Sequence, residues 1–178
     1  MSLDTASSLS EQFRAVRDHT EQLASALTNE DQCVQSMPDA SPAKWHRAHT
    51  TWFFEEFVLG PHLPGYEAFD PDFRFLFNSY YESVGARQPR PERGLITRPG
   101  AQDVGAYRRY VDAAIASLLR EREGEIADLL ALGLSHEQQH QELLVTDMMH
   151  AFAQSPLMPA VLPGWREPNG AGSAPERL

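Results

Sequence analysis

The stretch SPAKWHRAHTTWFFEEFVLG, residues 41–60, carries the clearest helix signals in the chain. Ser41 followed by Pro42 is typical of a helix start, and Gly60 is typical of a helix end. Between them, five side chains recur at helical spacing and form a stripe along one face of the predicted helix. The stripe is mostly aromatic, so we expect this face to point into the protein, although it also carries a histidine and a carboxylate. The stripe consists of Trp45, His49, Trp52, Phe53 and Glu56.

Helical periodicity continues on both sides of this segment. Capping boxes at Ser8 with Glu11 and at Ser135 with Gln138 mark two further helix starts. We also expect a short helix over 125–132, ended by Gly133, and helix in the later part of the aromatic segment 70–85. No alternating run is long enough to predict a strand, so the sequence predicts an all-α, four-helix bundle. Its four main helices are expected over residues 9–27, 42–59, 102–120 and 136–153.

The segment 86–100 is expected to be a long loop rich in proline and arginine. Loops of this length within a compact domain are often functional. Its four arginines form a candidate anion site, since guanidinium groups bind carboxylates in a bidentate manner. The alternative is that the loop is solvated and that its arginines offset the negative charge of an acidic surface. We expect the bundle to occupy residues 1–160 and a linker or tail to occupy residues 161–178. The four arginines are Arg87, Arg90, Arg93 and Arg98.

The composition narrows the class of protein. The 178 residues carry 25 acidic and 15 basic side chains, a net charge of −10, which disfavours binding to nucleic acid. A single cysteine, Cys33, rules out an internal disulfide. No apolar run approaches the roughly 20 residues that span a bilayer, and the first residues do not form a signal peptide. We therefore expect a cytoplasmic protein that does not associate with membranes.

The string HEQQH, residues 136–140, is the strongest local indication of chemistry. Two histidines at positions i and i+4 of a helix lie on one face and can bind one metal ion, although such a pair also arises by chance. A protease site with Glu137 as the general base fits the same string, but this residue lies about 100° around the helix from the histidines. A third ligand has to come from another element.

The candidates for that third ligand lie on the helix predicted over 42–59. His49 is on its aromatic stripe and is expected to point inward, although a lone buried histidine is more often a hydrogen-bonded core residue. His46 lies on the flank and suits a surface position or a role behind the ligands. Asp147 is expected to orient or pack against other groups rather than to bind the metal.

Three stretches resemble the N-terminal domain of the iron sulfoxide synthases of ergothioneine biosynthesis, which is a DinB-like four-helix bundle. They are SPAKWHRAHTTWFFE (41–55), FNSYYESVGARQPRPERGLITRP (77–99) and HEQQHQELLVTDMMHA (136–151). The resemblance covers most of residues 8–160, with the motifs in the same order as in the family. It implies a non-haem iron(II) site, with another divalent metal as the alternative. The implied ligands are His49, His136 and His140.

The resemblance also implies the reaction and its substrates. Members of that family use O₂ to join the sulfur of cysteine or γ-glutamylcysteine to hercynine, which is trimethylated histidine. Arg87 and Arg90 match the arginines that hold the carboxylates of the thiol, and Gln139 matches a glutamine near hercynine.

The family members continue into a second domain that resembles formylglycine-generating enzymes and supplies the catalytic tyrosine. We therefore expect no catalytic residue in this chain, which should bind iron but make little sulfoxide alone. The second domain would follow this chain or belong to a separate polypeptide. The alternatives are a stand-alone DinB-like transferase that depends on metal and thiol, and a non-catalytic metal-binding helical module.

Overall fold

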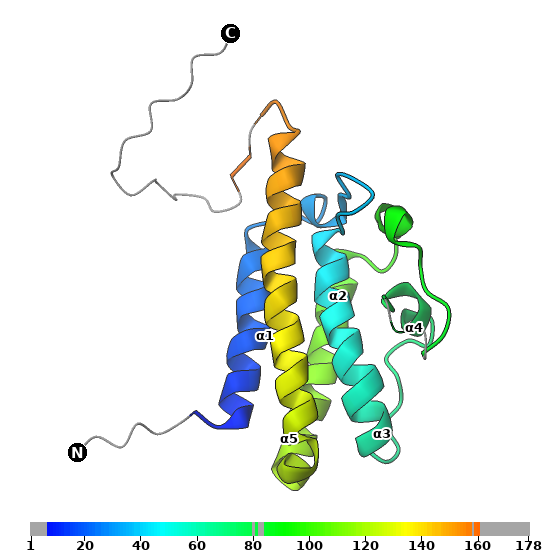
Figure 1. Ribbon diagram of the computed structural model, residues 1–178, viewed down its shortest axis with the longest axis vertical. Coiled ribbons are helices and arrows are strands. Elements are labelled where there is room, and N and C mark those ends of the chain that lie inside the picture. Colours follow the sequence, from blue (N-terminus) through cyan, green and yellow to red (C-terminus); the bar gives the residue numbers. More distant parts are fainter. Residues whose placement is uncertain (1–6, 80, 82–83, 158, 161–178) are drawn as a thin grey trace, which may run out of the picture.

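The computed structural model describes residues 7–79, 81, 84–157 and 159–160, and this part of the chain is helical without strands (Figure 1). None of its helices is both long and apolar enough to cross a membrane. The expected tail over residues 161–178 lies outside the described residues. The helices are α1 (Leu9–Ser25), α2 (Ala43–Phe53), the π-helix η2 (Phe54–Leu59), α3 (Gly60–His62), α4 (Phe73–Leu76) and α5 (Ala101–Ala153), with 3₁₀ turns at η1 (Asp31–Cys33) and η3 (Arg90–Leu95).

The element α5 consists of two antiparallel arms that meet at Arg122, whose backbone is not helical (φ −140°, ψ 30°). Figure 1 shows the chain reversing its direction there. Arg108 and Glu137 are 29 residues apart but their side chains are 2.8 Å apart, whereas a straight helix would separate these residues by about 43 Å. The first arm (101–121), the second arm (123–153), α1 and α2 form the bundle. The prediction of an all-α four-helix bundle is therefore confirmed.

The second arm is one helix, so the prediction that Gly133 ends a helix and that Ser135 starts the next one is wrong. The Ser135 hydroxyl donates to the carbonyl of Ala131, as in a helix interior. Gly133 serves packing instead: a Cβ at this position would lie 2.5 Å from Cε1 of Phe54 and 2.9 Å from Cε1 of Phe53. The missing side chain lets the second arm lie directly against the end of α2.

The helical segment that begins with α2 continues through η2 and α3 to His62, beyond the end that the sequence predicts. The π-helix η2 follows α2, and the backbone N–H of Gly60 bonds to the carbonyl of Glu55 within that wider turn. The chain turns at Gly65, which has a positive φ of 77°, rather than at Gly60. At the other end, the hydroxyl of Ser41 does not cap the helix but accepts a hydrogen bond from Arg93.

Among the described residues of the aromatic segment 70–85, helix is confined to the earlier part, in α4. The prediction of helix in its later part is wrong for the described residues 77–79, 81 and 84–85. The carbonyls of Leu76 and Phe77 accept hydrogen bonds from Trp45 Nε1 and His49 Nδ1 on α2, and so are used by the neighbouring helix. The expected long loop over 86–100 is present, with η3 within it.

Candidate metal centre

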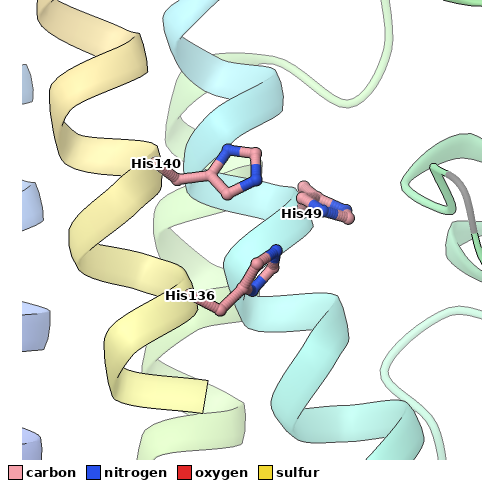
Figure 2. Close-up of side chains that lie close together, drawn as sticks. All are labelled: His49, His136 and His140. Atoms are coloured by element: carbon pink, nitrogen blue, oxygen red, sulfur yellow. The ribbon is translucent and has the colours of Figure 1, made fainter. Parts of the chain in front are cut away.

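Three histidines converge between α2 and the second arm of α5. His49, His136 and His140 each offer a ring nitrogen, and these nitrogens lie within 4.8 Å of one another. Figure 2 shows the three rings turned toward a common space, with His49 on α2 and the other two one helical turn apart on α5. The structure thus brings together the three residues that the sequence predicts as metal ligands.

His49 is held in one orientation by its neighbours. Its ring is stacked on Trp45 at a centroid distance of 4.6 Å and on Trp52 at 5.5 Å, with interplanar angles of 14° and 15°. Its Nδ1–H donates to the carbonyl of Phe77 at 2.6 Å, because a carbonyl can only accept. The lone pair of the neutral ring is therefore on Nε2.

His46 lies directly behind His140 and is buried rather than on the surface. Nδ1 of His46 is 2.9 Å from Nδ1 of His140, and Nε2 of His46 is 3.0 Å from Oδ2 of Asp147. The same carboxylate oxygen accepts the backbone N–H of Ser41 at 2.8 Å. His46 thus links Asp147 to His140.

A cavity of about 420 Å³ borders the three histidines. Arg90, Gln139 and Tyr81 are in its wall, whereas Arg87 is exposed and is not among the described residues that line it. The structure therefore brings two of the three predicted substrate-binding residues to the cavity. The full lining is Ser41, Trp45, His46, His49, Ser79, Tyr81, Arg90, Arg93, His136, Gln139, His140, Leu143 and Asp147.

Burial favours the neutral form of every histidine at this site. It lowers the pKa of His136 to about 4 and, together with the neighbouring His136, lowers the pKa of His49 well below its ordinary value. Burial and the nearby histidines His49 and His46 lower the pKa of His140 as well. Near pH 7 all three imidazole rings are neutral, and the neutral form is the one that binds metal ions.

The residues present fit a bound metal ion. The buried Nδ1 of His136 has no hydrogen-bond partner within the described part of the chain. Three neutral imidazoles suit iron, zinc, copper or nickel, so the donor set alone does not select one metal.

The sequence model of the DinB superfamily matches residues 12–144 of the chain, from α1 to the second arm of α5. The matched range includes all three histidines. The chain belongs to the DinB superfamily. None of the curated proteins compared with the chain is significantly similar to it. Membership of the DinB superfamily supports the fold, but it leaves the reaction open.

Glu137 lies away from the candidate metal site, so the interpretation of HEQQH as a protease site with Glu137 as the general base is wrong. The carboxylate faces the opposite side of the second arm and is fully buried. It accepts hydrogen bonds from Arg17 at 2.8 Å, Arg108 at 2.8 Å and Thr20 at 2.6 Å. Despite its burial, the two guanidinium groups and the hydroxyl lower the pKa of Glu137 to about 2. This carboxylate stabilises the interior and is not a general base at the histidines.

Arg93 lines the cavity, but the sequence alone does not distinguish it from the other arginines of the loop. It is buried, with Nη1 donating to Ser41 Oγ at 2.9 Å and Nη2 to Ser79 Oγ at 3.1 Å. Its guanidinium lies 3.4 Å from the centre of the Trp45 ring, a cation–π contact. Arg93, Trp45 and His49 therefore form successive layers of one stack at the wall of the cavity. No sequence signal separates Arg93 from Arg90, because only the tertiary structure places Arg93 against the indole of Trp45.

Proposed function

We propose that this DinB-superfamily bundle is the iron-binding part of an O₂-dependent sulfoxide synthase. The substrates would be hercynine and a thiol, either cysteine or γ-glutamylcysteine. The observation that carries the proposal is one cavity that holds three neutral imidazoles together with Arg90 and Gln139. The resemblance of the sequence to ergothioneine-pathway synthases selects this reaction among those that such a site can support.

The proposed reaction is a four-electron oxidation. The thiol S–H and one imidazole C–H of hercynine are replaced by a C–S bond, one atom of O₂ becomes the sulfoxide oxygen, and the other leaves as water. Iron(II) held by three histidines would supply open positions at which a thiolate and O₂ can meet. The protein has to hold both organic substrates next to those positions.

The arginines of the cavity suit the thiol substrate. Arg90 can place a guanidinium against a carboxylate of cysteine or γ-glutamylcysteine, a charge-assisted contact. Arg93 adds positive charge from a fixed position, since two serine hydroxyls and Trp45 hold it. Gln139 offers an amide on the same helix face as His136 and His140 for the second substrate. A domain resembling formylglycine-generating enzymes would complete the hercynine side, from the same or another polypeptide in the cytoplasm.

A second candidate is a transferase that uses a metal-bound thiolate as its nucleophile. It is favoured by the superfamily match, which identifies the bundle without reference to O₂ chemistry. The two candidates share the metal and the thiol but differ in whether O₂ is consumed. A bundle that binds metal but turns over neither substrate would be a non-catalytic module.

The test starts with the chain loaded anaerobically with iron(II). Cysteine or γ-glutamylcysteine is added while thiolate-to-iron absorbance is followed; hercynine and O₂ are then added and the products are analysed by mass spectrometry. We expect thiol binding and disulfide formation by this chain alone, and sulfoxide once a second-domain polypeptide is present. Thiol transfer to an electrophile without O₂ uptake would support the transferase, and absence of thiol binding would contradict both.

A further inference from the structure

His140 and two side chains behind it form a continuous hydrogen-bonded series. Asp147 Oδ2, His46 and His140 are joined by contacts of 3.0 Å and 2.9 Å, and the relative exposure of the His46 side chain is only 3%. The series starts on the second arm of α5, crosses to α2 and returns to the second arm. It therefore links a ligand to a carboxylate two helical turns further along the same helix.

Hydrogen-bond chemistry fixes where the protons lie. A carboxylate only accepts, so Nε2 of His46 carries a proton and donates it to Asp147. The Nδ1 of the neutral ring of His46 then has a lone pair and accepts. Nδ1 of His140 must therefore be the donor in the contact between the two histidines, and its lone pair is on Nε2.

We propose that Asp147 and His46 are positioning residues of the metal centre, which hold the proton of His140 on Nδ1 so that Nε2 is the ligand atom. The inference rests on the metal-binding part of the proposed function and not on the identity of the substrates. Groups behind metal-bound histidines commonly fix the tautomer and orientation of the ring, and their loss typically weakens metal affinity about 10- to 100-fold.

Comparison with His49 supports this role. The Nδ1–H of His49 donates to a backbone carbonyl, that of Phe77, and this leaves Nε2 free in the same way. Two ligands thus have the same tautomer, one set by the backbone and one set by two side chains. The carboxylate of Asp147 is itself held by the backbone N–H of Ser41, so the series ends at a fixed point.

The experiment measures the affinity of the metal-free full chain for zinc(II), a redox-inert probe, by competition with a chromophoric chelator. His46→Phe and Asp147→Ala should each weaken binding about 10- to 100-fold. The double variant should be no weaker than either single one, because both residues act through one series. Asp147→Asn keeps an acceptor oxygen and should retain most of the affinity. His150→Phe is the matched control, since His150 bonds to Ser36 Oγ away from the cavity; it should bind zinc normally.

Several results would overturn the inference. Wild-type affinity in His46→Phe or Asp147→Ala would remove the positioning role while the three-histidine site stood, and so would additive losses in the double variant. Lack of zinc binding by the wild-type chain would overturn both the metal site and this inference. ¹⁵N NMR of the wild-type metal-free chain provides a test that needs no variant to fold: a proton on Nε2 of His140 would contradict the proposed tautomer.

Discussion

Gly133 packs so closely against Phe54 that a Cβ atom at position 133 would lie 2.5 Å from Cε1 of that ring. His136 follows one helical turn later and has to reach the space beside His49 on α2. The missing side chain thus determines how closely the two ligand-bearing helices approach each other. The candidate metal site therefore depends on the contact between Gly133 and Phe54.

Replacing Gly133 with alanine should therefore lower both stability and metal affinity. Overpacking of a core typically costs about 1–3 kcal/mol, and displacement of the second arm would separate His136 from His49. Gly124→Ala is the matched control on the same arm, because nothing lies within 4 Å of its added Cβ; it should be neutral or stabilising by up to about 1 kcal/mol. Urea unfolding and zinc titration of both variants measure the two effects. Equal stability of the two variants would contradict the packing argument.

Alanine at any one of His49, His136 or His140 should reduce bound metal severely, because only two imidazoles would remain. Metal content after reconstitution measures the loss, and the rise in melting temperature on adding metal should disappear with it. His62→Ala is a suitable control, since this histidine lies on α3, away from the triad. A triad variant that keeps its metal would remove that residue from the site.

Replacing Glu137 with glutamine should destabilise the bundle by about 3–5 kcal/mol, because it leaves Arg17 and Arg108 buried without a full counter-charge. Glu142→Gln, exposed on the same arm, should stay within about 0.5 kcal/mol of the wild type. Denaturant unfolding of the two variants makes the comparison. A loss as small as that of the control would show that Glu137 does not stabilise the interior.

The carboxylate of Glu137 also makes the free energy of unfolding depend on pH. The pKa of Glu137 is about 2 in the folded protein, so the unfolded state binds more protons as the pH falls below the ordinary glutamate value of 4.5. This contribution to stability is present above pH 4.5 and is lost as the pH falls toward 2. Unfolding free energies measured from pH 6 to pH 3 should fall less steeply in Glu137→Gln than in the wild type. Parallel curves would contradict the assignment.

Arg90→Gln should weaken binding of cysteine or γ-glutamylcysteine to the iron-loaded chain by about 10-fold or more, because a charge-assisted contact is lost. Arg98→Gln is the control, because Arg98 is in the same loop but its guanidinium donates to the carbonyl of Thr97. The Arg87→Gln variant measures whether an exposed arginine outside the described lining of the cavity also contributes. Thiolate absorbance is the readout, and unchanged affinity in Arg90→Gln would remove this residue from the thiol site.

Local signals in the sequence were sufficient to predict the four bundle helices but not all of their ends, and the helix predicted in the later part of 70–85 is absent among the described residues. The capping box at Ser8 and Glu11 is formed as predicted. Gly60 and Gly133 both predict helix ends that are absent. Gly60 follows a π-helical turn, and Gly133 allows close approach of a neighbouring helix.

The site was predictable where ligands share a helix or carry a family motif. The i, i+4 spacing of His136 and His140 and the motif at His49 identify three residues that the fold brings together. The burial of His46 behind His140 and the stacking of Arg93 on Trp45 could not be predicted, since they depend on contacts between distant segments. Such contacts leave no periodicity in the sequence.

The triad also has a topological consequence. His49 and His136 are 87 residues apart in the sequence, from position 49 to position 136, so a bound ion acts as a removable cross-link that closes a long loop. The unfolded chain would have to pay the entropy of closing that loop before three ligands could meet. Coordination by all three histidines therefore requires α2 and the second arm to be docked, and an ion held by the triad would report that this part of the bundle has assembled.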